Sequence, residues 1–519
     1  MKYILCFITA RSTKTMALLA ILFAVPQSNG FATLPTTKHH CIHSTAGRLH
    51  ADLLESTLLE ETHATSCEEP DNSAAENIVR DLDGNKLTVE YFANNMNIKN
   101  VESYVCRDAF RDFNGNACRV HLQPGGQTAF FKRIHFATLD HALTKLKKAP
   151  FKLARDAQSY QVVASFLSSR ACRTLKETTG VIIPGLYDVR SEPDSVAPIQ
   201  SKFSFLFEDL SPADGWYQEW LLDDLESCEA ALSTLAKIHA YFWHGSDFWK
   251  NGGNDTAELE AAIWKSGSYI QPTAQGEHQW KTVAKEWDAK KRRFEAELSP
   301  MEYWDDLGVR LQSVAQECGR VTHPFAADDD SALFEEYRKY RTFTHGDPKQ
   351  ANLLFHCTKS SESTSSPKST DASSSTSTLR VGLIDFQWSG FGLAATDIAH
   401  FITSAVHADM LIDDGERILL DYYYKNLQTY LVEYGTCRNA EEAARLYSHD
   451  TYLEQYDTAV LDLCRLVIAY TWSRFTEPVE KGDVEGCART MNKTSYNKCI
   501  PNTVWLMTKC DELLKARGV

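Results

Sequence analysis

The fold of this chain is decided by two motifs, Thr344-His-Gly-Asp-Pro-Lys-Gln-Ala-Asn352 and Val381-Gly-Leu-Ile-Asp-Phe-Gln387. An apolar run follows the first motif and another leads into the second, which predicts two short strands. We expect these strands to form a hairpin that holds Asp347, Asn352 and Asp385 together at one end. Two carboxylates and an amide suit phosphoryl transfer, because one carboxylate can accept a hydroxyl proton while oxygen ligands hold magnesium on the phosphates of ATP.

The patterns His-Gly-Asp-x-x-x-x-Asn and Ile-Asp-Phe-Gln together resemble the aminoglycoside phosphotransferase and choline kinase superfamily, and within it the ecdysteroid-kinase-like branch. The resemblance implies an α+β, protein-kinase-like fold of two lobes, with a small, mostly antiparallel β N-lobe and a large, mainly helical C-lobe. It also implies transfer of the ATP γ-phosphate to a hydroxyl of a small molecule, with ATP and Mg2+ bound. In this scheme Asp347 is the catalytic base, and Asn352 and Asp385 are the magnesium ligands.

A second catalytic candidate is Lys349, which stands two residues after Asp347 and three before Asn352. Protein kinases of the His-Arg-Asp-Leu-Lys-x-x-Asn type place a lysine at that offset, where it can neutralise charge on the transferring phosphate. A solvated loop lysine is the alternative. His345 is expected to be a packed residue that orients the loop and takes no part in proton transfer.

Two candidates for binding the nucleotide phosphates lie in strand-like segments. The apolar strand Thr128–Ile134 carries Lys132, which matches the family's lysine for the α- and β-phosphates, while Arg133 should point to the opposite face. Gly115 follows a predicted turn, and in the family this hairpin covers the phosphates. An ordinary hairpin turn is the alternative for Gly115.

A further segment, Phe205-Leu-Phe-Glu-Asp-Leu210, resembles the connection between the lobes whose backbone grips adenine. It contributes Phe207 and Asp209 as nucleotide-binding candidates. Just before it in the chain, the apolar run Val181–Pro184 is predicted to form a strand.

The predicted helix Arg155–Leu167 departs from the family, in which a Glu on this helix pairs with the strand lysine. Val163 stands where that Glu is expected. Three explanations remain open: Asp156 pairs with Lys132 instead, the alignment is shifted, or the active form is less well poised. The last favours a catalytically weak pseudokinase that serves as a nucleotide-binding regulatory module. A protein kinase is disfavoured, because Ala-Pro-Glu is absent and Gln387 stands where protein kinases have Gly.

The remaining apolar periodicity predicts a helical C-lobe. His239, on one of these helices, is expected to be a buried structural residue. Asp397 either caps a helix or, as in the family, braces the catalytic loop. The helices are predicted at residues 88–96, 155–167, 232–243, 281–298, 418–431, 459–473 and 503–514.

The N-terminal residues 1–30 are predicted to be a signal peptide, with an apolar run, Met16–Val25, that is too short to span a bilayer. We therefore expect entry into the secretory route and no stable membrane span after cleavage. Residues around Phe31 resemble the presequences of algae with secondary plastids, so the plastid is one expected destination and secretion or an endomembrane lumen the other. After the signal peptide we expect a linker or transit-peptide remainder (31–85), a kinase-like N-lobe (86–210) and a kinase-like C-lobe (211–519). The C-lobe contains a Ser/Thr-rich insert (358–378) that we expect to be disordered.

The 519 residues carry a net charge of -15, which argues against nucleic acid as a partner. The 14 cysteines show no Cys-x-x-Cys and no zinc-site spacing, and we favour reduced thiols. The expected partner is a small-molecule alcohol. Choline-like, sugar-like, steroid-like and antibiotic-like acceptors all fit, and the sequence leaves the oligomeric state open.

Overall fold

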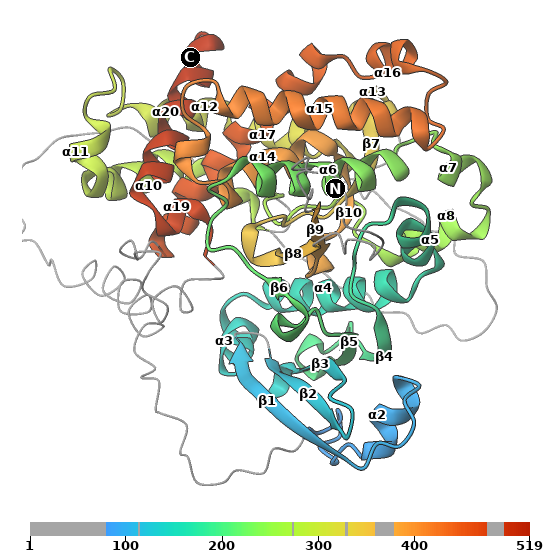
Figure 1. The fold of residues 1–519 in the computed structure, drawn as a ribbon. Helices are drawn as coiled ribbons and strands as arrows, with labels where there is room; N and C mark the ends of the chain where they lie inside the picture. Colours follow the sequence, from blue (N-terminus) through green and yellow to red (C-terminus); the bar gives the residue numbers. More distant parts are fainter. Residues whose placement is uncertain (1–78, 113–114, 272–274, 327–330, 359–377, 475–492) are drawn as a thin grey trace, which may run out of the picture. The chain divides into compact units, whose positions relative to one another are not determined.

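The computed structural model describes residues 79–112, 115–271, 275–326, 331–358, 378–474 and 493–519 (Figure 1). The chain divides into two units, Met1–Ala75 and Glu76–Val519, and every described residue belongs to the second. The predictions for the signal peptide, for most of the linker and for the interior of the insert lie outside the described residues.

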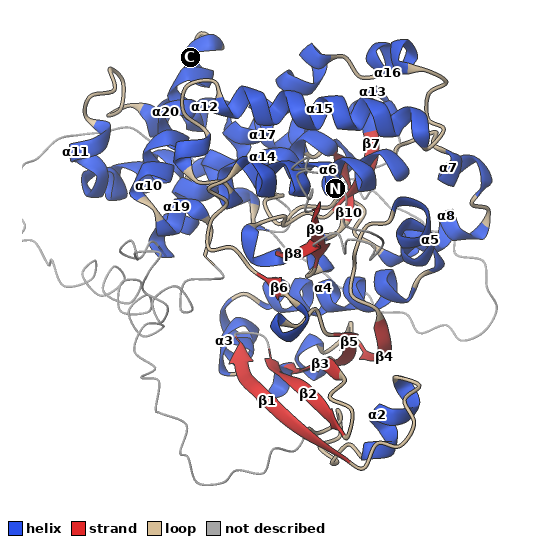
Figure 2. Ribbon diagram, viewed as in Figure 1, coloured by secondary structure: helices blue, strands red, loops and turns tan. Residues whose placement is uncertain are grey.

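Five strands form one sheet in the order β1-β2-β3-β5-β4, drawn as red arrows in Figure 2. Each neighbouring pair is antiparallel, which confirms the predicted antiparallel sheet. The strands are β1 (Ser103–Asp112), β2 (Gly115–Gln123), β3 (Thr128–His135), β4 (Leu186–Glu192) and β5 (Lys202–Glu208).

The two faces of this sheet belong to two separate cores. One face packs Ile134 and Phe205 against Tyr160 of α4 (Pro150–Ser168), the helix that follows α3 (Asp140–Lys148). The other face packs Phe131 against Phe92 of α2 (Val89–Asn95). Because alternate residues of β3 enter opposite cores, the side chains next to Phe131 are fixed in direction as well.

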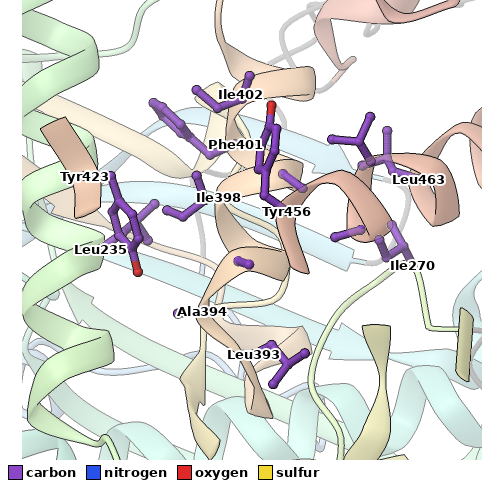
Figure 3. Close-up of a cluster of buried hydrophobic side chains, with 14 of the residues drawn as sticks. Leu235, Ile270, Leu393, Ala394, Ile398, Phe401, Ile402, Tyr423, Tyr456 and Leu463 are labelled. Atoms are coloured by element: carbon purple, nitrogen blue, oxygen red, sulfur yellow. The ribbon is translucent and has the colours of Figure 1, made fainter. Parts of the chain in front are cut away.

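The rest of the described chain is mainly helical, as predicted. Its largest core centres on α14, whose residues are all buried. Figure 3 shows Ile398 and Phe401 of α14 among side chains from α6, α15 and α17, including Leu235, Tyr423 and Tyr456. The helices are α5 (Arg170–Thr179), α6 (Leu225–Tyr241), α7 (Asp247–Asn251), α8 (Asn254–Ala262), α10 (Val283–Lys290), α11 (Glu295–Leu298), α12 (Leu307–Thr322), α13 (Ala332–Tyr337), α14 (Ala394–Ala405), α15 (Gly415–Glu433), α16 (Ala440–Leu446), α17 (His449–Ala469), α19 (Ser495–Lys498) and α20 (Ile500–Ala516).

The predicted hairpin between the two motifs is confirmed. β8 (Leu353–Thr358) pairs antiparallel with β9 (Thr378–Leu383), and Leu353 lies opposite Leu383. The short β6 (Trp216–Tyr217) extends this sheet, and β7 (Arg341–Thr344) pairs with β10 (Gly390–Leu393). At the open end of the hairpin, where the two motifs meet, the Leu383 N–H donates to the Ile182 carbonyl at 2.9 Å and the Ile384 N–H to the Asn352 carbonyl at 3.1 Å.

Two predictions from the apolar pattern are wrong. Val181–Pro184 is no strand but contributes an isolated parallel bridge between Ile182 and Gly382; proline has no N–H to continue a ladder, and β4 begins only at Leu186. The single helix predicted at 281–298 is divided into α10, a 3-10 turn at Lys291–Phe294, and α11.

The described residues contain no helix long and apolar enough to cross a membrane. Ten cysteines are recorded among them, and all ten are free thiols.

Gly115 begins β2 and lies against the backbone of β3. A Cβ on this residue would stand 2.3 Å from the backbone oxygen of Arg133. We therefore expect Gly115→Ala to force the strands apart and to lower the free energy of unfolding by about 2 kcal/mol, measured by urea denaturation.

The control is Gly185→Ala, whose Cβ would meet only the flexible Glu208 side chain, at 3.3 Å. It should change the free energy of unfolding by less than about 0.5 kcal/mol. Equal stability of Gly115→Ala and the unmodified protein would mean that close strand packing is not the reason for this glycine.

Candidate active site

Asn352 and Asp385 flank the open end of the β8–β9 hairpin, where Leu353 pairs with Leu383. The Ile384 N–H donates to the Asn352 carbonyl at 3.1 Å, so the two side chains leave adjacent backbone positions. Asp385 has φ +66°, in the left-handed region that a non-glycine residue rarely adopts. A backbone held in this region costs roughly 1–3 kcal/mol, so the surrounding packing must determine it.

The Asp347 carboxylate is 5% exposed and meets three polar side chains. Lys349 Nζ donates to Oδ2 at 2.8 Å, and Asn352 Nδ2 donates to the same oxygen at 3.3 Å and to the Asp347 carbonyl at 2.7 Å. His400 Nε2 lies 3.5 Å from Oδ1. The structure thus brings the two predicted catalytic residues and one predicted magnesium ligand into direct contact.

Carboxylates from both motifs act on the Lys349 ammonium group. Burial works against its ammonium form, but the carboxylates of Asp347 and Asp385 together raise the pKa of Lys349 above its ordinary value. The side chain is 19% exposed. Lys349 is therefore a protonated amine within electrostatic reach of the Asp347 and Asp385 carboxylates, which is unlike a solvated loop lysine.

His400 was missed from the sequence. It lies on α14, 2% exposed, and its Nδ1 has no hydrogen-bond partner. Burial lowers the pKa of His400 below the ordinary value, although the Asp347 carboxylate opposes this. One sequence signal was available. Asp397 and His400 are three residues apart, so on a helix their side chains lie on one face and can contact the same loop.

Asp397 braces the catalytic loop. Its Oδ2 accepts the His345 N–H at 2.6 Å and its Oδ1 accepts the Gly346 N–H at 2.9 Å. His239 Nε2 lies 3.2 Å from Oδ2, while its Nδ1 lies 2.7 Å from the Tyr423 hydroxyl. The capping alternative is wrong, because α14 has Leu393 at its N-cap. The bracing expected from the family is confirmed.

The pKa of Asp397 shows how this brace is balanced. Burial alone would raise it, but hydrogen bonding and charge from His239, His345 and the Gly346 N–H hold it below the ordinary value. His239 is fully buried, which confirms the predicted structural histidine.

His345 is also packed as predicted. Its Nε2 lies 2.9 Å from the Ile384 carbonyl and its Nδ1 lies 3.3 Å from the Asp347 N–H. Since a carbonyl only accepts and an N–H only donates, the imidazole carries its proton on Nε2. Its ring contacts Phe386 with centroids 4.8 Å apart. His345 therefore joins the two motifs.

A strap at Trp264–Ile270 supports the same loop from the predicted C-lobe. The N–H groups of Tyr269 and Ser268 donate to the carbonyls of Gly346 (2.8 Å) and Trp388 (3.0 Å). Gly346 has φ +83°, and a Cβ there would stand 2.2 Å from the Trp388 oxygen. Glycine is therefore required in the motif for close approach as well as for its backbone angle.

A pocket of about 440 Å³ collects most of the predicted nucleotide-binding residues. Lys132, Phe207, Asp209, Asn352 and Asp385 all line it. The two catalytic candidates are outside its lining, and so is Gly115, whose missing side chain is explained by strand packing.

The structure gives Asp209 a definite partner. Its Oδ2 accepts from Nε of Arg119 on β2 at 2.6 Å, and the Asp209 side chain is only 3% exposed. This ion pair ties the segment after β5 to the hairpin above the pocket. Arg119 and Gln218 are among the lining residues that were missed, and Gln218 donates to the Ala351 carbonyl at 2.6 Å.

The predicted pair of Asp156 with Lys132 is wrong. Both carboxylate oxygens of Asp156 are engaged, Oδ2 by Lys145 at 2.5 Å and Oδ1 by Arg155 at 2.8 Å. Lys132 lies in the pocket with its Nζ 5.5 Å from the centre of the Tyr160 ring, and Arg133 turns to the opposite face, as predicted. Val163 lines the same pocket. At this position α4 therefore presents an apolar side chain to the pocket.

The donor set suits magnesium better than a softer metal. Because Asn352 Nδ2 donates to Asp347, its Oδ1 is the atom left for a cation, beside the Asp385 carboxylate. Both are hard oxygen donors. In the described part of the chain no three His, Cys, Asp or Glu side chains converge as a metal site. Asn352 and Asp385 would therefore hold the ion jointly with phosphate oxygens, which is the usual way proteins hold magnesium.

A five-stranded antiparallel sheet, a helical C-terminal part and a carboxylate loop at their shared pocket define a kinase-like protein. The model of the ecdysteroid kinase-like family matches residues 171–436, just over half of the chain, and the chain belongs to this family. The matched range contains Asp347, Lys349, Asn352 and Asp385 but begins after Lys132 and α4. Family and fold together indicate a phosphotransferase of the small-molecule kinase type.

Two solved structures are similar at low levels. An amicoumacin kinase in complex with AMP-PNP, Ca2+ and Ami has a TM-score of 0.34 and 9% identity, over 79% of this chain and 87% of that one. A Plasmodium vivax ethanolamine kinase has a TM-score of 0.34 and 10% identity, over 82% and 89%. At these values the likeness says nothing about the activity of this chain. No curated protein sequence matches it.

We expect Asp397→Asn to weaken the brace, because an amide has one acceptor oxygen where two backbone N–H groups must be satisfied. The free energy of unfolding should fall by about 3 kcal/mol in urea denaturation. Asp409→Asn is the control, since that side chain is 79% exposed and the same charge is removed. Comparable stability of the two variants would contradict the bracing role.

Proposed function

We propose that this protein transfers the γ-phosphate of ATP to a hydroxyl of a small-molecule acceptor, with Mg2+ as the metal. The observation that carries the proposal is the cluster of Asp347, Lys349 and Asn352 beside Asp385. A carboxylate held at 2.8 Å by a lysine amine, next to two hard oxygen donors, matches the demands of phosphoryl transfer.

In the proposed reaction Asp347 receives the hydroxyl proton of the acceptor as the oxygen attacks the γ-phosphorus. The bond from that phosphorus to the β–γ bridging oxygen breaks, and ADP leaves. Lys349 lies where it can offset negative charge on the transferring group, and Lys132 where it can hold the α- and β-phosphates. Magnesium, when bound, neutralises charge on the phosphates, and Asn352 Oδ1 and Asp385 are the side chains that would hold it.

The pocket supports the nucleotide half of this proposal. Phe207 stacks on Phe205 with centroids 5.3 Å apart and lines the pocket where the family places adenine. The phosphates would then extend toward Asn352 and Asp385 on the opposite wall. The acceptor would approach Asp347 from outside the described pocket lining.

One observation favours a second function, a nucleotide-binding pseudokinase. Val163 in the pocket lining cannot form the ion pair that the family's Glu makes with the strand lysine. Since charge pairing of that lysine is part of the active state in protein kinases, its loss would lower turnover without preventing nucleotide binding.

The decisive experiment measures ATP consumption by the full chain with Mg2+ against a pooled library of small alcohols, for the unmodified protein and for Asp347→Asn. We expect turnover with at least one acceptor and a loss of about a hundredfold or more in the variant, because general-base catalysis contributes at least that much. Mg·AMP-PNP binding, followed by calorimetry, should change little. Magnesium-dependent nucleotide binding without turnover on any acceptor would instead favour the pseudokinase.

Lys349→Ala separates the catalytic role of this lysine from a structural one. We expect turnover to fall roughly tenfold to a hundredfold, since a charge aimed at the transferring group is lost. The control is Lys425→Ala, which removes an exposed lysine from α15. Unchanged turnover in Lys349→Ala would exclude the proposed role.

A further inference from the structure

Helix α4 lacks the family's glutamate, yet it is joined to the loop after Asp385 by another side chain. The guanidinium of Arg155 lies over the ring of Trp388, 5.3 Å from its centre. Trp388 ends the 3-10 turn Phe386–Trp388, which begins directly after Asp385. Figure 1 shows α4 between the five-stranded sheet and the β8–β9 hairpin, where it can contact both.

We propose that the stacking of Arg155 on Trp388 positions Asp385 for magnesium, in place of an ion pair between α4 and the strand lysine. Arg155 is a positioning residue in this proposal and acts through the turn Phe386–Trp388. The magnesium part rests on the function proposed above.

The Arg155 side chain is well placed for a strong contact. It is 15% exposed, and Asp156 holds its guanidinium through Nη2 at 2.8 Å and Nε at 3.2 Å. Asp156 in turn accepts from Lys145 of α3. Because the guanidinium plane is already fixed by Asp156, Arg155 loses little side-chain entropy when it packs on the indole. Because the side chain is partly desolvated, the cation–π interaction is more favourable than that of an exposed arginine.

Trp388 is held equally firmly on its other sides. Its indole is 7% exposed, stacks on Trp264 with centroids 6.0 Å apart and meets Tyr269 edge-on at 5.3 Å. Its carbonyl accepts the Ser268 N–H at 3.0 Å. The strap therefore holds Trp388 from the predicted C-lobe, and Arg155 joins α4 to this fixed point.

The turn is thus restrained at both ends. Phe386 packs between Phe166 of α4 (5.2 Å) and His345 (4.8 Å), and Trp388 meets Arg155. Asp385 immediately precedes this turn with φ +66°, a conformation that persists only when its surroundings determine it. Loss of Arg155 would remove the restraint that α4 places on Trp388, while the strap and the Phe166 contact remain. The fold should therefore survive, and Asp385, just before the turn, should be held less precisely.

Calorimetry with AMP-PNP tests this on the full chain, with and without Mg2+. We expect Arg155→Ala to weaken Mg·AMP-PNP binding roughly threefold to thirtyfold and to leave metal-free AMP-PNP binding unchanged. Arg155→Lys keeps the charge but not the planar group and should be weakened as well. The matched control, Arg173→Ala, removes an exposed arginine of α5 and should bind as the unmodified protein does. Equal weakening with and without Mg2+, or full affinity in Arg155→Lys, would overturn the proposal.

A double-mutant cycle in urea denaturation tests the contact independently of magnesium. Arg155→Ala and Trp388→Leu should be non-additive, with the double variant little less stable than Trp388→Leu alone. Additive losses would overturn the proposal even if magnesium binds. If the unmodified protein shows no magnesium-dependent binding, the proposed phosphotransferase function fails, and so does the proposed positioning of Asp385 for magnesium. Non-additive stabilities in the double-mutant cycle would still establish the contact between Arg155 and Trp388.

Discussion

The loop that carries Asp347 depends on one buried charge, the Asp397 carboxylate. An uncompensated carboxylate in the interior costs several kcal/mol, so the fold must supply donors to it. The donors are the His345 and Gly346 N–H groups and the His239 imidazole. Because two of them are consecutive backbone groups of the motif, satisfying the charge also fixes where the next residue, Asp347, leaves the chain. The loop is set from α14 and α6 and not by its own sequence alone.

Local spacing explains why the hairpin and its site could be predicted. The two motifs flank short apolar strands, and the first residues of the pairing, Leu353 and Leu383, put Asn352 and Asp385 together whatever the rest of the chain does. The strand containing Lys132 was predicted for the same reason, since alternation alone assigns Lys132 and Arg133 to opposite faces. Val181–Pro184 shows the limit of this reasoning, because an apolar run that forms no ladder of backbone hydrogen bonds has the same sequence pattern as one that forms a strand.

Residues that act across long separations could not be found this way. His400 and Arg119 meet their partners only after α14 packs on the loop and β2 folds over the pocket. The partners of Asp156 were equally hidden. Its helical position pointed to Lys132, but Lys145 of α3 and the adjacent Arg155 engage its two carboxylate oxygens instead. Competition among several cations for one carboxylate is decided by tertiary geometry, on which sequence spacing is silent.

The strap at Trp264–Ile270 constrains how the backbone next to Asp347 can vary. Its hydrogen bonds to the catalytic loop run from backbone to backbone, and Gly267, Gly346 and Gly390 stand where a Cβ would meet main-chain atoms at 2.8 Å or less. The main chain at this junction therefore cannot move without displacing Gly346 and, with it, Asp347. In the proposed reaction Asp347 is the base, so specificity for an acceptor would have to arise from side chains, since a shift of the strap's backbone would displace Asp347 as well.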